Sequence, residues 1–200
     1  ELLTDEARRL YREALEAEDP AEDDAVEGEN TQASAGDRRY RRTTRELMRR
    51  FAPHDGPWGT INVLALDASG ELCAGVSTSG YPWKYPGRVG DSALPGAGNY
   101  CDLRNGAAAC TGRGEMAMRA CASRAIVDLL AAGASPPDAC AGMLADARAL
   151  PDDYSAELRA IALTPDGRHG GAAGKPGSVY ALMTPGHDGP EMLPRKLVGG

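Results

Sequence analysis

The alternation of apolar and polar positions is clearest in the middle of the chain, where it predicts a β-hairpin. An apolar run covers residues 60–66, a turn signal follows at residues 67–70, and a second apolar run covers residues 72–76. Thr60 stands at the head of the first strand, where a β-branched residue is most often an ordinary strand former. Only residues further along the chain can give this threonine a role in chemistry.

Helical spacing of apolar residues predicts three helices outside an arginine-rich segment at residues 37–51. One covers residues 4–18, and another runs from residue 114 to 132 with Gly133 as its C-terminal stop. Ser135-Pro136 supplies an N-cap and a first-turn proline for the next helix, whose apolar face extends to Ala147.

The remaining pattern predicts short strands and a long loop. Residues 77–98 are rich in glycine and proline and cannot form one regular element, and we expect the tail after Pro185 to be irregular. Further strands are expected at residues 106–111, 158–163, 170–174 and 179–183. The order of strands and helices predicts an α+β fold, with two helices covering one face of a largely antiparallel sheet.

Charge is concentrated in the first quarter of the chain. Nine acidic residues fall between Glu13 and Glu29, which fits a solvated loop or an acidic interaction tail. Seven arginines follow within residues 37–51, which fits an amphipathic helix facing that acidic segment or a nucleic-acid patch. The nearby acidic residues would compete for these arginines, which favours the helix, and the net charge of −7 argues against a nucleic-acid partner.

Composition limits the classes of protein and site that fit the chain. No apolar run approaches the ~20 residues that span a bilayer, so we expect no membrane partner. The five cysteines show no CxxC spacing and the three histidines no metal-ligand spacing, so neither a disulfide framework nor a metal site is expected. Free cysteines favour a reducing, cytoplasmic compartment. The chain begins with Glu1 rather than Met, which fits a processed product or a fragment.

Four short segments carry the polar residues that a hydrolase would need. They read TINVLALD at residues 60–67, STSG at 77–80, GRVGDS at 87–92 followed by PGAG at 95–98, and AACTGRGE at 108–115. In order and spacing they resemble the glycosylasparaginases and the related plant-type asparaginases and isoaspartyl peptidases, which are N-terminal nucleophile hydrolases. The resemblance implies an αββα sandwich, of which this chain would supply mainly the β-subunit half.

The resemblance implies a nucleophile made by self-cleavage between Gly59 and Thr60. The cut would free the α-amine of Thr60 to act as the base for its own hydroxyl, because an α-amine has a pKa of about 7.7–8.0. Thr78 would hydrogen-bond and tune that hydroxyl. The oxyanion hole would be formed by Thr111 and Gly112.

The resemblance also implies a binding site for the substrate's aspartyl head group. Arg88 would hold the α-carboxylate, Asp91 the α-ammonium, and Gly114 would let the backbone approach the substrate. The alternative for Arg88 and Asp91 is a structural salt bridge within a loop. The expected ligand is a small asparagine-type molecule, with no cofactor, and the expected assembly is a homo-oligomer of αβ units.

Two positions depart from the family pattern, and the front of the chain is short. Gly59 stands before the nucleophile where aspartate is common, and Asn62 stands where glycine is usual. Residues 1–59 resemble only the tail of the family's α subunit, and residues 60–200 its β subunit. We therefore expect a glycosylasparaginase-like amidohydrolase. An isoaspartyl peptidase or L-asparaginase of the same family, or a truncated non-catalytic fragment or pseudoenzyme, are the alternatives.

Overall fold

The computed structural model describes Asp5, Arg9, Lys84 and residues 59–81, 87–151 and 157–199. The predicted arginine-rich helix and acidic loop lie outside these residues, as does all but Asp5 and Arg9 of the predicted helix at 4–18. The chain divides into two units, and the predicted site residues all belong to the one made of Gly59–Gly80 and Gly87–Gly200.

The predicted hairpin is confirmed as strands β1 (Ile61–Leu66) and β2 (Leu72–Ser77). They pair antiparallel, with Ile61 opposite Ser77 and Leu66 opposite Leu72. The turn forms because the Asp67 carboxylate accepts hydrogen bonds from the backbone N–H groups of Ser69 (2.8 Å) and Glu71 (2.9 Å). This register places Thr60 and Thr78 side by side at the open end of the hairpin.

A five-stranded sheet forms the centre of this unit. Its strand order is β3-β4-β5-β6-β9, and every pair is antiparallel except β6 with β9. A second hairpin pairs β7 with β8. The bounds are β3 (Asn99–Asp102), β4 (Gly106–Gly112), β5 (Leu158–Leu163), β6 (His169–Ala173), β7 (Val179–Leu182), β8 (Glu191–Pro194) and β9 (Lys196–Leu197).

The strand predictions succeeded where a side-chain pattern existed. β4, β5, β6 and β7 are confirmed to within one or two residues. The prediction of an irregular tail is wrong, because β8 and β9 lie there, and β3 was not predicted. These three strands have two to four residues each, too short to show an alternation, and they form by pairing with β7, β6 and β4.

The predicted helix at 114–132 is two helices. α3 (Gly114–Arg119) ends before Cys121, whose φ of 44° lies in the left-handed region, and α4 (Ala122–Ala131) starts after it. The prediction of one continuous helix was therefore wrong. α5 (Pro136–Ala149) begins as predicted, with the Ser135 hydroxyl accepting a hydrogen bond from the Asp138 N–H.

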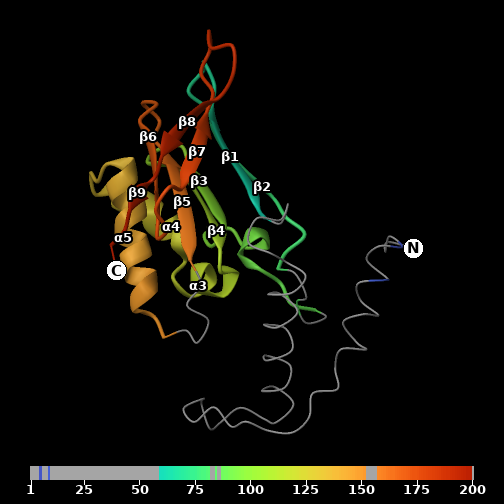
Figure 1. The fold of residues 1–200 in the computed structure, drawn as a ribbon. Coiled ribbons are helices and arrows are strands. Elements are labelled where there is room, and N and C mark those ends of the chain that lie inside the picture. The colour runs from blue at the N-terminus through green and yellow to red at the C-terminus, as the bar shows by residue number, and fades with distance from the viewer. Residues whose placement is uncertain are drawn as a thin grey trace, which may run out of the picture. The chain divides into compact units, whose positions relative to one another are not determined.

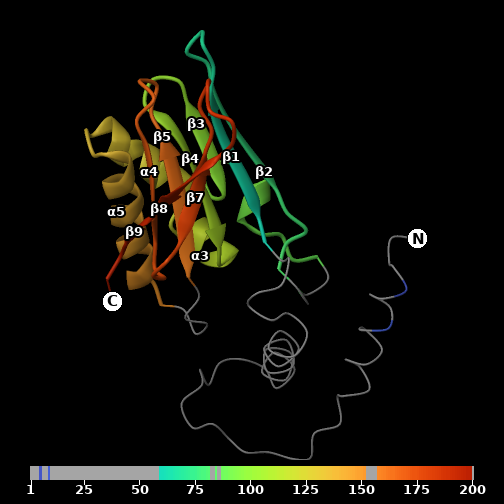
Figure 2. The same cartoon turned by 45° about the horizontal axis from the view of Figure 1, so that its top comes forward.

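The elements form three layers, which Figures 1 and 2 show from two directions. α4 and α5 cover one face of the five-stranded sheet, as predicted, and the two hairpins lie on its other face. The helix-facing core uses small sheet residues such as Ala108, Cys110 and Ala160 beneath larger helix residues such as Ile126 and Met143. Small side chains on the sheet let the helices pack closely against it.

The outer face of the β1–β2 hairpin is apolar and open. Ile61 is 69% exposed and Val63 57% exposed, although both belong to a strand whose other face packs on β4 and β5. A strand with apolar residues on both faces is typical of a buried position, so this surface is suited to a covering layer. None of the described helices is long and apolar enough to cross a membrane.

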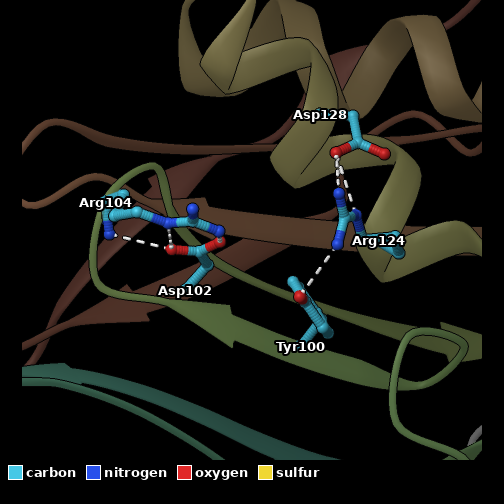
Figure 3. A network of polar contacts seen from close by, with 5 residues as sticks. All are labelled: Tyr100, Asp102, Arg104, Arg124 and Asp128. Atoms are coloured by element: carbon cyan, nitrogen blue, oxygen red, sulfur yellow. Dashed lines mark hydrogen bonds and ion pairs between the residues drawn. The ribbon is translucent and has the colours of Figure 1, made fainter.

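A polar network joins α4 to β3 on the helix side of the sheet (Figure 3). The Arg124 guanidinium donates to the Tyr100 hydroxyl at 3.0 Å and pairs with Asp128 at 2.7 Å, and it lies 5.2 Å from the centre of the Tyr100 ring. Beside it, Arg104 pairs with Asp102 across a tight turn. The Arg104 side chain is 81% exposed, and those of Arg124 and Asp128 are about half exposed, so the network adds to the docking of the helix without forming a buried site.

Candidate active site

The predicted nucleophile and its predicted partner lie together. Thr60 directly precedes β1 and Thr78 directly follows β2, and a hydrogen bond of 3.1 Å joins their hydroxyl oxygens. The Thr78 hydroxyl also accepts from the Gly80 N–H at 3.0 Å, which fixes its position. Among the described residues, a Cβ at Gly59 would meet no atom within 4 Å, so packing does not explain the glycine before Thr60.

Arg88, Asp91 and Gly114 also converge, at the start of α3. A Cβ at position 114 would lie 2.7 Å from Asp91 Oδ1 and 3.0 Å from Arg88 Nη2, so any larger residue would displace both side chains. Gly90 is crowded in the same way, because a Cβ there would lie 2.6 Å from Arg88 Nη1. The glycines therefore make room for a cation and an anion side by side.

Asp91 is held in an unusual electrostatic state. The residue is only 7% exposed, and its Oδ2 is buried without a hydrogen-bond partner in the described part of the chain. Burial raises the pKa of Asp91 above its ordinary value, against the lowering effects of its own backbone N–H and the charge of Arg88. A buried carboxylate oxygen with no partner is a site prepared for a donor, such as an ammonium group.

Glu115 holds the Arg88 side chain in place, a role that was not predicted from the sequence. Arg88 Nε donates to Glu115 Oε1 at 2.8 Å, while Arg113 Nε lies 3.6 Å from Glu115 Oε2. Burial acts to raise the pKa of Glu115, but the Arg88 hydrogen bond and the charges of both arginines leave it below its ordinary value. Glu115 therefore faces the Nε edge of Arg88.

Thr111 and Gly112, the predicted oxyanion hole, are the last two residues of β4, and Arg113 joins them to α3. Gly112 has a φ of 127°, and a Cβ there would lie 2.0 Å from the Glu157 carbonyl oxygen. Only glycine fits such a position. The glycine therefore lets the end of β4, two residues before Gly114, lie against the backbone of Glu157, and Gly114 itself lies beside Arg88 and Asp91.

One side chain links the nucleophile strand to the turn strand. Asn62, two residues after Thr60, donates from Nδ2 to the carbonyl oxygen of Cys110 at 2.9 Å, and Cys110 directly precedes Thr111. From there the backbone continues to the head-group pocket, because the Cys110 N–H donates to Gly98 and the Gly98 N–H donates to Asp91. The Thr60 pair and the Arg88–Asp91 pair therefore belong to one bonded framework.

Sequence reasoning overlooked the roles of Glu115 and Asn62. An acidic residue directly after the Thr-Gly turn, and an amide within an apolar strand, are the signals that could have indicated them. Among the described residues no group of histidine, cysteine and carboxylate side chains could hold a metal ion. Burial raises the pKa of the Cys110 thiol to about 12, so this cysteine is not a competing nucleophile.

Comparisons with known proteins agree with these motifs. A family model described as Asparaginase matches residues 2–189. The chain is 40% identical over 136 residues to a Drosophila yakuba protein named "Putative N(4)-(beta-N-acetylglucosaminyl)-L-asparaginase", an alignment covering 67% of this chain and 34% of that protein. It is 44% identical over 81 residues to the rat N(4)-(beta-N-acetylglucosaminyl)-L-asparaginase, covering 40% of this chain and 24% of the relative.

A relative with a different name matches over a similar length. An L-asparaginase-like protein of Drosophila erecta is 41% identical over 93 residues, covering 46% of this chain and 23% of that protein. The chain thus spans about a third or less of the length of these relatives.

Proposed function

The chain belongs to the asparaginase family of N-terminal nucleophile hydrolases, and we propose that it carries the nucleophile and the aspartyl-binding pocket of an amidohydrolase. The proposed reaction cleaves the side-chain amide of asparagine derivatives such as N4-(N-acetylglucosaminyl)asparagine. No cofactor takes part in this proposal, because the nucleophile and base come from one residue.

The observation that carries this proposal is the unpartnered, buried Oδ2 of Asp91 beside the Arg88 guanidinium. A free aspartyl head group has one ammonium and one carboxylate on the same carbon. Asp91 supplies an acceptor for the ammonium, and Arg88 supplies two donors for the carboxylate. Glu115 balances the charge of Arg88 through the hydrogen bond from Arg88 Nε.

Thr60 is the proposed nucleophile, and it is activated by self-cleavage. Its hydroxyl attacks the Gly59 carbonyl, the peptide nitrogen leaves as the α-amine of Thr60, and water hydrolyses the resulting ester. The α-amine then serves as base for the hydroxyl that Thr78 holds at 3.1 Å. At neutral pH a useful fraction of this amine is unprotonated, given a reference pKa of about 7.7–8.0.

Turnover then follows acyl-transfer chemistry. The α-amine takes the proton of the Thr60 hydroxyl as its oxygen bonds to the side-chain carbonyl carbon of the substrate. The negative charge on the carbonyl oxygen is stabilised by the Thr111 hydroxyl and the Gly112 N–H. The amine returns the proton to the leaving nitrogen, which departs and leaves a β-aspartyl ester on Thr60. Water attacks this ester by the same route and releases aspartate.

We propose that the chain supplies mainly the β-subunit half of an αββα sandwich, assembled as a homo-oligomer of αβ units. In this proposal residues 1–59 are the tail of the α subunit. The open apolar face bearing Ile61 and Val63 supports it, since a further layer would cover these side chains. The short span relative to the family's named members also supports it.

Mass spectrometry and substrate turnover test the proposal together. The full gene product is expected to split between Gly59 and Thr60 and to release aspartate from N4-(N-acetylglucosaminyl)asparagine. A chain that stays uncut after long incubation and releases no aspartate would support the pseudoenzyme alternative instead.

An isoaspartyl peptidase or L-asparaginase activity is the second candidate. Arg113 places a second guanidinium near Glu115 and the pocket, which favours a leaving group with its own carboxylate. Comparing kcat/KM for the glycosylated asparagine, a β-aspartyl dipeptide and free asparagine decides between these substrates. Faster turnover of the dipeptide, with the preference lost in Arg113→Ala, would establish the second candidate.

A further inference from the structure

We infer that Asn62 is a positioning residue for this reaction: its carboxamide holds the strand that carries Thr60 in place over the strand that carries Thr111. The inference rests on the proposed function, because it concerns the distance between the nucleophile and the oxyanion hole. It assigns a role to a position at which the family resemblance leads one to expect glycine.

The first step concerns which group donates a hydrogen bond to the backbone carbonyl of Cys110. In an antiparallel pair, residues opposite each other commonly exchange two backbone hydrogen bonds. The Cys110 N–H donates to the Gly98 carbonyl at 2.8 Å, but the Gly98 N–H donates instead to the Asp91 carbonyl at 3.1 Å. The carbonyl of Cys110 therefore loses its reciprocal donor, and Asn62 Nδ2 supplies it at 2.9 Å.

The second step is the place of this bond in the framework. Asn62 shares the sheet-facing side of β1 with Thr60, since the two are separated by one residue. The bond ties β1 to β4 at the end where both strands reach the candidate site, and β1 lies against β4 along the layer interface (Figure 1). Loss of the bond would free β1 to shift relative to Thr111 and Gly112.

The third step concerns the free-energy cost of burying the Asn62 carboxamide. Asn62 Oδ1 is buried without a hydrogen-bond partner in the part of the chain that the structure describes. Simple packing would favour an apolar residue here, because an unmatched buried acceptor destabilises the fold. The amide is therefore better explained by the bond that its nitrogen makes than by space filling.

Asn62→Leu is the direct test, because leucine has a similar volume and no donor. In the full gene product, kcat for aspartate release is expected to fall about tenfold while KM stays within about threefold, since misplacement of the nucleophile affects the chemical step. Should leucine prevent folding, Asn62→Ala is the second variant, with the same direction expected in kcat.

The matched control is Cys101→Ala. Cys101 Sγ makes the corresponding link at the far end of the hairpin, donating to the Leu72 carbonyl at 3.3 Å. This variant is expected to change the unfolding midpoint but to keep kcat. A folded Asn62 variant whose kcat is no lower than that of Cys101→Ala would overturn the inference and leave the proposed function standing. If the wild-type protein showed no turnover, both the inference on Asn62 and the proposed function would be rejected.

Discussion

The two halves of the candidate site are built in opposite ways. The nucleophile half consists of two neutral hydroxyls, Thr60 and Thr78, at the open end of a hairpin whose outer face is exposed. The head-group half consists of charged groups, Arg88, Asp91 and Glu115, packed against glycines at the start of α3. One half is accessible and uncharged, and the other is charged and largely enclosed.

This difference indicates where each half obtains its function. In the head-group half, the Arg88–Glu115 hydrogen bond is already formed, and Asp91 Oδ2 is buried without a hydrogen-bond partner among the described residues. Thr60 and Thr78 are already hydrogen-bonded, but in the proposed function Thr60 gains its base, the α-amine, only when the peptide bond before it is broken. In the proposed function, recognition would therefore come from folding, and reactivity from a covalent step after folding.

The largest effect is expected from removing the Thr60 hydroxyl in the nucleophile half. Thr60→Ala is expected to abolish self-cleavage and to lower kcat by at least about four orders of magnitude, because no other residue can form the ester. Thr60→Ser keeps a hydroxyl and an α-amine and is the matched control, with cleavage retained. Intact mass and aspartate release measure both results. Turnover surviving in the alanine variant would exclude Thr60 as the nucleophile.

The next effect separates binding from stability in the head-group half. Asp91→Asn is expected to lower kcat/KM by at least about a hundredfold, because the ammonium loses its counter-charge. The same variant is expected to raise the unfolding free energy by about 0.5–2 kcal/mol, as relief of a strained site often does. Chemical denaturation at neutral pH measures the second effect.

The sign of that stability change comes from the raised pKa. As pH rises past the ordinary value of 3.8, the unfolded chain ionises Asp91 before the folded chain does, so native stability falls in this window. Asparagine removes this loss. If the variant is less stable than wild type at neutral pH, Asp91 is instead a structural member of a loop ion pair.

The roles of the residues in both halves stay predictions from the sequence, and the contacts that hold these residues were not predicted. Thr60 and Thr78 are joined by a hydrogen bond, and Arg88, Asp91 and Gly114 lie close together. Glu115 and Asn62 escaped prediction because their roles depend on which atoms approach them across 27 and 48 residues of chain. No local pattern encodes such a meeting.

The fold shows the same limit. Elements with a strong side-chain pattern, such as β1, β2 and α5, were predicted, whereas β3, β8 and β9 depend on partner strands. The break at Cys121 was missed because nothing in a run of small residues marks a left-handed backbone position. Periodicity reports local burial, while short strands and breaks are decided by tertiary contacts.

A smaller effect is expected from changing Glu115 in the head-group half. Glu115→Gln weakens the anchor on Arg88 Nε, so KM is expected to rise about tenfold with a smaller change in kcat. Asp128→Asn is the matched control, because Asp128 also pairs with an arginine but lies in the network of Figure 3. Equal KM values for the two variants would mean that Arg88 needs no anchor.

Glu115 also makes a prediction about pH. Its pKa lies below the ordinary value of 4.5, so the stability that it contributes is present above that pH and is lost as pH falls further. The wild-type unfolding free energy is expected to drop more steeply below about pH 4.5 than that of Glu115→Gln. If the unfolding free energies of wild type and Glu115→Gln fell equally with falling pH, the charge-assisted hydrogen bond between Arg88 and Glu115 would be contradicted.

The smallest expected effect lies in the network of Figure 3, which includes Arg124 but not its neighbour Ser123 at the start of α4. Ser123 is fully buried and donates to the Ala97 carbonyl at 2.8 Å, one residue from the Gly98 that bonds Asp91 and Cys110. The Arg124 side chain points instead to Tyr100 and Asp128.

Arg124→Ala is therefore expected to lower Tm only slightly, by at most about 2–4 °C, with kcat and KM unchanged. Ser123→Ala, by contrast, is expected to lower kcat/KM because it loosens the loop behind Asp91. If Arg124→Ala reduced turnover as much as Ser123→Ala, the helix layer as a whole would support the site. The enclosed half would then owe its geometry to α4, and not to the Gly98 framework alone.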